Sequence, residues 1–449
     1  MVQPTAPSLW APVDAPHRVV TLDVLRGFAI LGVLVANTLT FAYPMASSPP
    51  GAEAWRGTGW ADRIAALLVG LLVEGKFYTL LSVLFGVGLA MQAGRAKAAG
   101  RPFGPFYLRR AAVLFSIGVL HGVLLYAGDI LAFYAIVSVA ALPFLKLPPR
   151  WLTAAALTSA LLGVATLSLY AWSHPARPYP APRDWSVPGE QLRQSLDPIE
   201  RGAADVLERA GVQRQQFFDM MADEARIYRA GSWMEITRFR AITALLLLLP
   251  SKVLLLGLMV LAFFLCGMRL VRSPLFIQQD GATLAHCRSL LYAGVPSGLL
   301  LTVVAGGVPA MLPHSAFFAP SLYWAGTFGG VLLQSLGYCG GLLLVCARHP
   351  RGIVVRALSA VGRTALSNYI LQSVVLGLVF YGNGLGLVTR LTALPVVTLA
   401  VPVFALETWL SLAWLRWHAM GPVEWMWRSL AYGRPLPLRR EAPGAAGGL

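Results

Sequence analysis

Long runs of apolar residues, separated by short polar links, recur along the whole chain. A helix that crosses the hydrocarbon core of a bilayer needs about 20 such residues. The runs lack the strict alternation of apolar and polar positions that marks the strands of a membrane barrel. The pattern therefore predicts an all-α, polytopic integral membrane protein with about ten transmembrane helices. We place these spans at 19–43, 64–91, 110–127, 129–146, 151–172, 244–271, 289–312, 319–346, 364–385 and 394–415.

Composition supports the prediction of a membrane protein and indicates which kinds of partner to expect. Of the 449 residues, 57% are hydrophobic and only 12% are charged, whereas a soluble domain carries about 25% charged residues. The lipid bilayer is therefore the expected environment. The net charge of +16 lies in short links between apolar runs, not on a basic soluble face, so we expect no nucleic-acid partner.

The basic residues also orient the chain. They gather in the links after the second, fourth, sixth and eighth runs and in the tail after the tenth. Basic links face the cytoplasm in membrane proteins. Both termini are therefore predicted to be cytoplasmic.

One long segment, 173–243, then faces outward and separates a half at 1–172 from a half at 244–449. Its second part should form one or two surface helices, because apolar residues follow a helical spacing there. These helices are either a simple cap or a lid over an outward-facing cavity. The residues of that stripe are Phe217, Met220, Met221, Ile227 and Tyr228.

Ionisable residues inside membrane spans are costly and are candidate functional groups. Asp23 and Arg26 share one helix face and form either a local ion pair or part of a cytoplasmic pocket. Glu74 and Lys76 flank Gly75. They are either a compensated pair inside the bundle or the sign of a broken helix, since two charges so spaced cannot face the same way in a regular helix.

His121 and Asp129 lie on either side of a predicted tight helical hairpin in the outer half of the membrane. A neutral imidazole can take a proton from a hydroxyl or amine, and a carboxylate can orient the ring and stabilise its cation. The other interpretation is a structural histidine that is hydrogen-bonded between helices. No His/Cys cluster has the spacing of a metal site, so no metal is expected.

Polar residues also enter the last two spans. Ser367, Asn368 and Gln372 form a stripe that either bonds neighbouring helices or lines a passage. Glu407 lies near mid-membrane, and it must be protonated or find a partner elsewhere, such as Lys76. Asn37 is a further polar group inside a span.

Several stretches together resemble the YeiB-like bacterial membrane proteins, whose second half is a domain of unknown function. They occur in family order over nearly the whole chain: Arg18 to Gly32 with Asn37, Lys76–Phe77 followed by Leu84 to Gly88, His121 to Asp129 with the Ile-Leu that follows, Gly362 to Gln372, and Gly421 to Arg428. The resemblance implies a multi-pass protein of the bacterial cytoplasmic (inner) membrane.

The YeiB-like group is in turn similar to the transmembrane acyltransferase superfamily, which includes heparan-α-glucosaminide N-acetyltransferase. That likeness, through Leu22 to Gly27, implies transfer of an acyl group from cytoplasmic acyl-CoA or acetyl-CoA to a small-molecule, glycan or lipid acceptor outside. His121 would be the base and Asp129 its orienting acid. The cationic and amide side chains expected to hold the CoA phosphates are Arg26, Arg109, Arg110, Arg363 and Asn368. The passage would be lined by Asp23, Asn37, Glu74, Lys76, Ser367, Gln372 and Glu407.

Two other function classes fit the same sequence. A proton-coupled transporter or exporter needs mid-membrane charges such as Glu74, Lys76 and Glu407, and two halves of similar size. A non-catalytic receptor or assembly factor would use 173–243 as its partner surface. A homo-oligomer is compatible with all three. The arginines, taken one by one, fit topology and lipid headgroup contact as well as phosphate binding.

Overall fold

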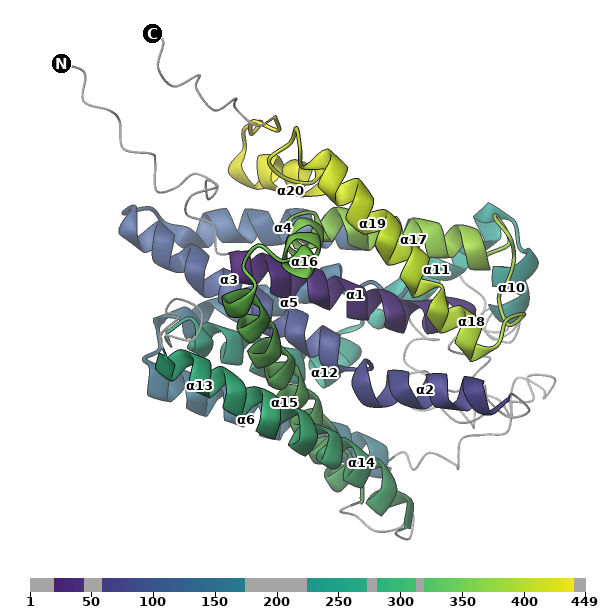
Figure 1. Ribbon diagram of the computed structural model, residues 1–449, viewed down its shortest axis with the longest axis horizontal. Helices are drawn as coiled ribbons and strands as arrows, with labels where there is room; N and C mark the ends of the chain where they lie inside the picture. The colour runs from purple at the N-terminus through teal and green to yellow at the C-terminus, as the bar shows by residue number, and fades with distance from the viewer. Residues whose placement is uncertain (1–19, 44–58, 174–223, 273–280, 312–318, 440–449) are drawn as a thin grey trace.

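The computed structural model describes residues 20–43, 59–173, 224–272, 281–311 and 319–439 (Figure 1). The regular elements in these ranges are helices, with one isolated β-bridge between His418 and Arg439. Within these ranges, eight helical stretches are long and apolar enough to cross a membrane, and two shorter apolar helices accompany them. The all-α, polytopic fold predicted from the sequence is confirmed.

The first half contains α1 (Val20–Ala42), α2 (Trp60–Leu72), α3 (Lys76–Ala98), α4 (Phe103–Leu124), α5 (Leu131–Ala140) with a 3-10 turn (Leu142–Lys146), and α6 (Pro149–Ser173). The rest contains α10 (Glu224–Ala230), α11 (Trp233–Leu247), α12 (Pro250–Leu270), α13 (Gly281–Ser289), a π-helical turn (Leu290–Gly294), α14 (Val295–Met311), α15 (Ala319–Arg348), α16 (Ile353–Arg363), α17 (Ala365–Phe380), α18 (Ala393–Thr398), α19 (Ala400–Trp414) and α20 (Pro422–Tyr432).

Helix α1 runs through the middle of the bundle, and α3, α16 and α17 pack against it (Figure 1). Two glycines bring α1 and α16 into backbone contact. A Cβ atom on Gly27 would lie 1.9 Å from the carbonyl oxygen of Leu358, and one on Gly362 would lie 1.8 Å from that of Asp23. Small residues allow this close approach of helices in membranes.

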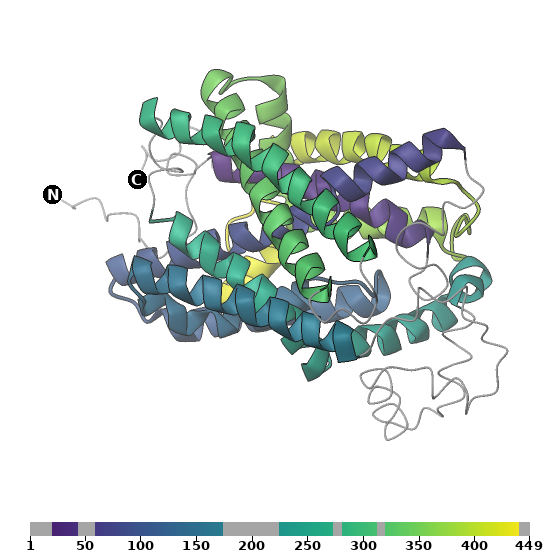
Figure 2. The same cartoon turned by 90° about the horizontal axis from the view of Figure 1, so that it is seen from below.

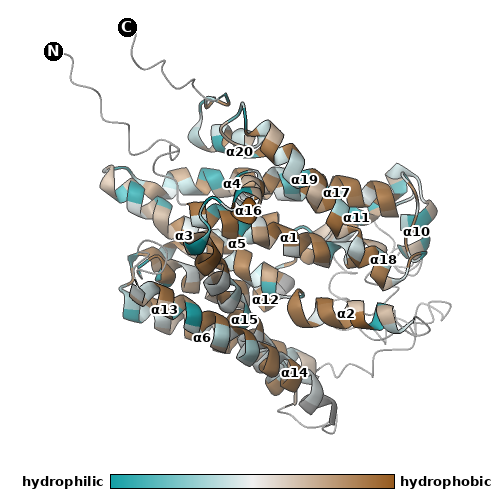
Figure 3. Cartoon of the chain, in the orientation of Figure 1, coloured by the Kyte–Doolittle hydropathy of each residue, from teal (hydrophilic) through white to brown (hydrophobic). Residues whose placement is uncertain are grey.

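The periphery is apolar, as a lipid-facing surface requires. Leu67 on α2, Leu161 on α6 and Val401 on α19 are 58%, 70% and 70% exposed. Hydrophobic residues cover α2 and much of the other outer helices (Figure 3). The run formed by α13 and α14 lies beside α15 at the edge of the molecule (Figure 2).

Four predicted spans differ from the helices observed. The span at 64–91 is broken between α2 and α3 at Gly75, whose φ of 78° favours glycine. The span at 244–271 is wrong at its start, because α11 ends at Leu247 and α12 begins with Pro250, which has no N–H to continue a helix. The span at 129–146 shortens to α5 plus the 3-10 turn, and the span at 394–415 divides at Leu399 into α18 and α19.

Two ends of the bundle matter for the site. We call the end where α3 finishes, α4 begins and α20 lies the basic end; it is the side predicted to face the cytoplasm. The opposite end carries α10, which with the first part of α11 belongs to the predicted outer segment 173–243. Ile227 and Tyr228 on α10 are buried, and Tyr228 stacks on Tyr381 with ring centroids 4.6 Å apart. The other stripe residues, Phe217, Met220 and Met221, lie outside the described residues.

Candidate functional site

The His121–Asp129 pair forms at the end of α4. Nδ1 of His121 lies 2.9 Å from Oδ1 of Asp129, and both side chains are buried. The other oxygen of Asp129 accepts a hydrogen bond of 2.8 Å from the backbone N–H of Ala132, in the first turn of α5. The helical hairpin thus brings the two residues into contact and holds the carboxylate at the N-terminus of α5.

A serine completes the surroundings of His121. Ser373 on α17 is buried, and its Oγ lies 2.9 Å from Nε2 of His121. The ring of Tyr369, one turn earlier on α17, lies 4.8 Å from the imidazole, centroid to centroid. The sequence did not point to Ser373, because serines are common in membrane helices and this one is 252 positions from its partner.

A cavity of about 280 Å³ opens at the basic end. Its interior is apolar, with Leu81, Leu84, Phe85, Leu131 and Tyr134 in its wall. Tyr369 and Ile130 also line it. Tyr369 contacts His121 and Ile130 follows Asp129 in the chain, so the cavity ends one side chain from the His121–Asp129 pair.

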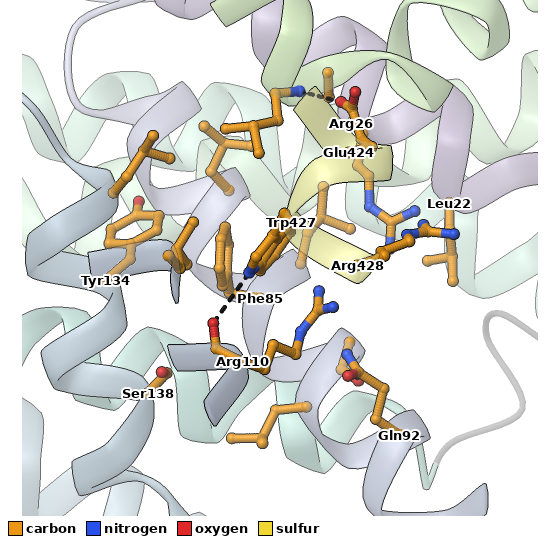
Figure 4. A pocket seen from close by; sticks show the side chains of 18 of the residues that line it. Leu22, Arg26, Phe85, Gln92, Arg110, Tyr134, Ser138, Glu424, Trp427 and Arg428 are labelled. Carbon is orange, nitrogen blue, oxygen red and sulfur yellow. Dashed lines mark hydrogen bonds between the residues drawn. The ribbon is translucent and has the colours of Figure 1, made fainter. Parts of the chain in front are cut away.

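Five arginines line the cavity: Arg26, Arg95, Arg110, Arg363 and Arg428. Figure 4 shows the guanidinium groups of Arg26, Arg110 and Arg428 on the same side of the cavity, around Trp427. Three of the arginines proposed for CoA are therefore present, while Arg109 is exposed and lies outside the lining. Arg95 and Arg428 belong to the basic link and tail whose charge predicts a cytoplasmic face, and the sequence did not mark them as site residues.

Trp427 belongs to the cavity wall. Its Nε1 donates to the carbonyl oxygen of Arg110 at 3.0 Å, and the guanidinium of Arg110 lies 3.7 Å from the centre of its ring. Such cation–π contacts are strongest with tryptophan. Helix α20 is thereby fixed to α4 at the mouth of the cavity.

Glu424 fixes the same helix to α17. Its carboxylate accepts hydrogen bonds from the backbone N–H groups of Leu366 (2.6 Å) and Ser367 (3.2 Å) and from the Ser367 hydroxyl (2.5 Å). These N–H groups belong to the first turn of α17, which has no partners for them within the helix. Glu424 therefore caps the helix that carries both Tyr369 and Ser373.

We expect Glu424→Ala to lower the unfolding temperature of the purified protein, because two backbone N–H groups lose their acceptor. Burying an unsatisfied donor costs about 1–3 kcal/mol. Glu235→Ala is the matched control, since Glu235 caps the first turn of α11 in an exposed capping box. Equal shifts for the two variants in a thermal melt would contradict this account of Glu424.

Of the other polar residues predicted for the site, Asp23 alone lines the cavity, and it is bonded to Arg26 at 3.0 Å. Asn37 accepts from the Tyr78 hydroxyl at 2.9 Å. Asn368 donates to Ser411 on α19 at 3.0 Å. Asn368 is thus separate from the arginines that it was expected to join.

The mid-membrane charges do not form one path. Lys76 is buried and donates to the carbonyl oxygen of Gly70 at 2.8 Å, whereas Glu74 is exposed. The broken helix, one of two interpretations of this pair, is correct. The partner of Glu407 is Gln372, at 3.1 Å, and not Lys76. In the described ranges no three His, Cys, Asp or Glu side chains gather as metal ligands do.

Comparison with known proteins confirms the resemblance to the YeiB-like proteins. Residues 270–434 match a family described as "Protein of unknown function (DUF418)". The chain is 28% identical to the uncharacterized protein YxaH of Bacillus subtilis (strain 168), over 94% of this chain and 96% of YxaH. It is also 28% identical to the uncharacterized protein YeiB of Escherichia coli (strain K12), over 92% of this chain and 96% of YeiB. No solved structure matches the chain.

Proposed function

We propose that this multi-pass membrane protein, similar to YeiB and YxaH over almost its whole length, is an acyltransferase. It would take an acyl group from a CoA thioester at the basic end and deliver it to a hydroxyl or amine that arrives from the opposite end. One observation carries the proposal: a cavity that is ringed by arginines and apolar inside ends against Tyr369, which contacts His121.

The cavity matches the chemistry of a CoA ester. CoA presents phosphate groups at one end, and arginine binds phosphate with paired N–H donors. The acyl and pantetheine parts are mostly uncharged, and the wall formed by Leu81, Leu84 and Phe85 suits them. A ligand bound with its phosphates beside Arg110 and Arg428 would point its thioester towards Tyr369.

The His121–Asp129 pair supplies the base. In this role the Asp129 carboxylate accepts from Nδ1–H of His121 with one oxygen, while its other oxygen accepts from Ala132. Nε2 of the neutral ring is then the basic nitrogen. Nε2 can take the proton of an attacking group, and the carboxylate stabilises the imidazolium that results.

The proposal predicts that purified protein binds acetyl-CoA or a longer acyl-CoA in detergent, and that Arg110→Gln weakens this binding by about 10- to 100-fold. Loss of a hydrogen bond to a charged group costs about 1.5–3 kcal/mol. Arg109→Gln is a matched control, because it removes the same charge one position away from an exposed side chain outside the cavity. Isothermal titration with dephospho-CoA alongside CoA tests for phosphate recognition.

His121→Ala should leave this binding intact while stopping acyl-CoA turnover. If well-folded wild-type protein binds no CoA ester, the acyltransferase proposal is wrong. A proton-coupled carrier would then be the better account, and transport by proteoliposomes would be the assay to run. Equal weakening by Arg109→Gln and Arg110→Gln would mean that only the overall charge attracts the ligand.

A further inference from the structure

Ser373 has a contact that the proposed function does not use. Asp129 lies at Nδ1 of His121, and the Ser373 hydroxyl lies 2.9 Å from the other ring nitrogen, Nε2. Ser373 is 1% exposed. The three side chains come from the end of α4, the start of α5 and the middle of α17. Serine, histidine and aspartate are therefore in line, with the ring between the other two.

The base role proposed for His121 sets the direction of proton donation. With the neutral ring donating from Nδ1–H to the Asp129 carboxylate, Nε2 carries a lone pair and accepts. The Ser373 hydroxyl is then the donor in the bond of 2.9 Å. Its other acceptor, the carbonyl oxygen of Tyr369, is 3.4 Å away, which is a weak bond. A serine whose proton points at a histidine base is the arrangement that activates a nucleophile.

We propose that Ser373 is the nucleophile of this protein and carries the acyl group as a covalent ester between the two substrates. The inference rests on the proposed function. In the first half, Oγ of Ser373 bonds to the thioester carbonyl carbon while Nε2 of His121 takes its proton. The C–S bond breaks, and His121 gives that proton to the CoA thiolate.

The second half reverses these roles. The acceptor hydroxyl or amine bonds to the carbonyl carbon of the acyl-serine, and His121 takes the acceptor's proton. The C–O bond to Ser373 breaks, and His121 returns the proton to Oγ. The balance is one acyl group moved from sulfur to the acceptor and one proton moved from the acceptor to CoA, with His121 and Ser373 restored.

Ser373 lies near the middle of α17, where a covalent intermediate would let the two substrates react without being bound at the same time. It lies eight residues from Ala365 and seven from Phe380, so about 12 Å of helix separates it from the basic end and about 10 Å from the other. Two substrates from opposite faces would need a site open to both at once, which would breach the barrier. An acyl-serine lets each substrate use the site in turn.

A fluorophosphonate probe tests for the nucleophile without any knowledge of donor or acceptor, because it bonds to an activated serine oxygen with loss of fluoride. We expect wild-type protein to be labelled at Ser373, as mapped by peptide mass spectrometry. Ser373→Ala should lose the label and His121→Ala should lose most of it. The control is Ser168→Ala, which removes a buried hydroxyl that donates to the carbonyl of Val164 in α6 and should leave labelling unchanged.

Acetyl-CoA provides the second readout. Without acceptor, wild-type protein should release about one equivalent of CoA in a burst and gain an acetyl group on Ser373. Ser373→Cys should keep an acyl adduct, now as a thioester. The inference is overturned if wild-type protein turns over acetyl-CoA with neither a label nor an adduct on Ser373, or if folded Ser373→Ala keeps the wild-type rate.

These outcomes separate the inference from the proposed function. Binding and turnover of acetyl-CoA without a serine adduct would leave the acyltransferase standing and remove the covalent step. A fluorophosphonate label on Ser373 in protein that binds no CoA ester would support Ser373 as a nucleophile and contradict the proposal that a CoA thioester is the acyl donor.

Discussion

Asp129→Asn is expected to lower acyl transfer by about 10³–10⁴-fold, the loss typical when the acid of a serine–histidine–acid group becomes an amide. The side chain keeps its shape and can still accept from Ala132, so the start of α5 is preserved. Its amide N–H₂, however, would face Nδ1 of His121. That donor favours the tautomer with the proton on Nε2, and the ring then has no basic nitrogen for Ser373 or for an acceptor.

The measurement is acetyl-CoA-dependent release of CoA by purified protein, alongside acyl-CoA binding, which should not change. The control is Glu235→Gln, an equally conservative change of a helix-capping carboxylate far from the pair in the sequence. A rate for Asp129→Asn close to that of the wild type would remove Asp129 from the chemistry and leave it a helix cap.

Gly362→Ala is expected to have the largest effect on folding. The new Cβ atom would lie 1.8 Å from the carbonyl oxygen of Asp23, and backbone cannot move aside as a side chain can. Overpacking in a core typically costs about 1–3 kcal/mol, and a direct clash between two helix backbones should exceed that. Separation of α16 from α1 would also disturb Asp23 and Arg26, which line the cavity.

The fraction of protein that elutes as a single species in size-exclusion chromatography, followed by a thermal melt, checks this prediction. Gly94→Ala is the matched control. Gly94 lies inside α3 with open space at its Cβ position, so alanine should be neutral or should stabilise the helix by up to about 1 kcal/mol. A folded Gly362→Ala protein with unchanged melting would show that the contact between α1 and α16 is not needed.

The membrane-spanning architecture could be predicted because lipid imposes a simple rule on sequence. A helix surrounded by hydrocarbon must be apolar over its whole length, so the runs are visible without knowledge of their neighbours. Helix α16 was not predicted from the apolar runs, because it carries Arg356 and Arg363 and packs on α1 with one face. The break in 244–271 likewise depends on Pro250 and the position of α11, which apolar character alone does not reveal.

Within the candidate site, side-chain contacts were predictable only between residues that are close in the sequence. His121 and Asp129 are eight residues apart across a short hairpin, so their proximity followed from the hairpin itself. Ser373 and Glu424 reach their partners across 252 and 58 positions, and no local pattern encodes such contacts. Arg109 and Arg110 illustrate the same limit, because adjacent residues point in different directions on a helix and packing decides which one faces the cavity.

The cap that Glu424 places on α17 also bears on the order in which the molecule is assembled. The ribosome makes α17 58 residues before it makes the carboxylate that satisfies the first turn of that helix. Until then, Leu366 and Ser367 must find water or lipid headgroups as acceptors. Helix insertion can therefore precede completion of the cavity, and the arginine-lined mouth closes around Trp427 only after α20 has emerged. A membrane-inserted intermediate without the completed cavity is thus inherent in the order of synthesis.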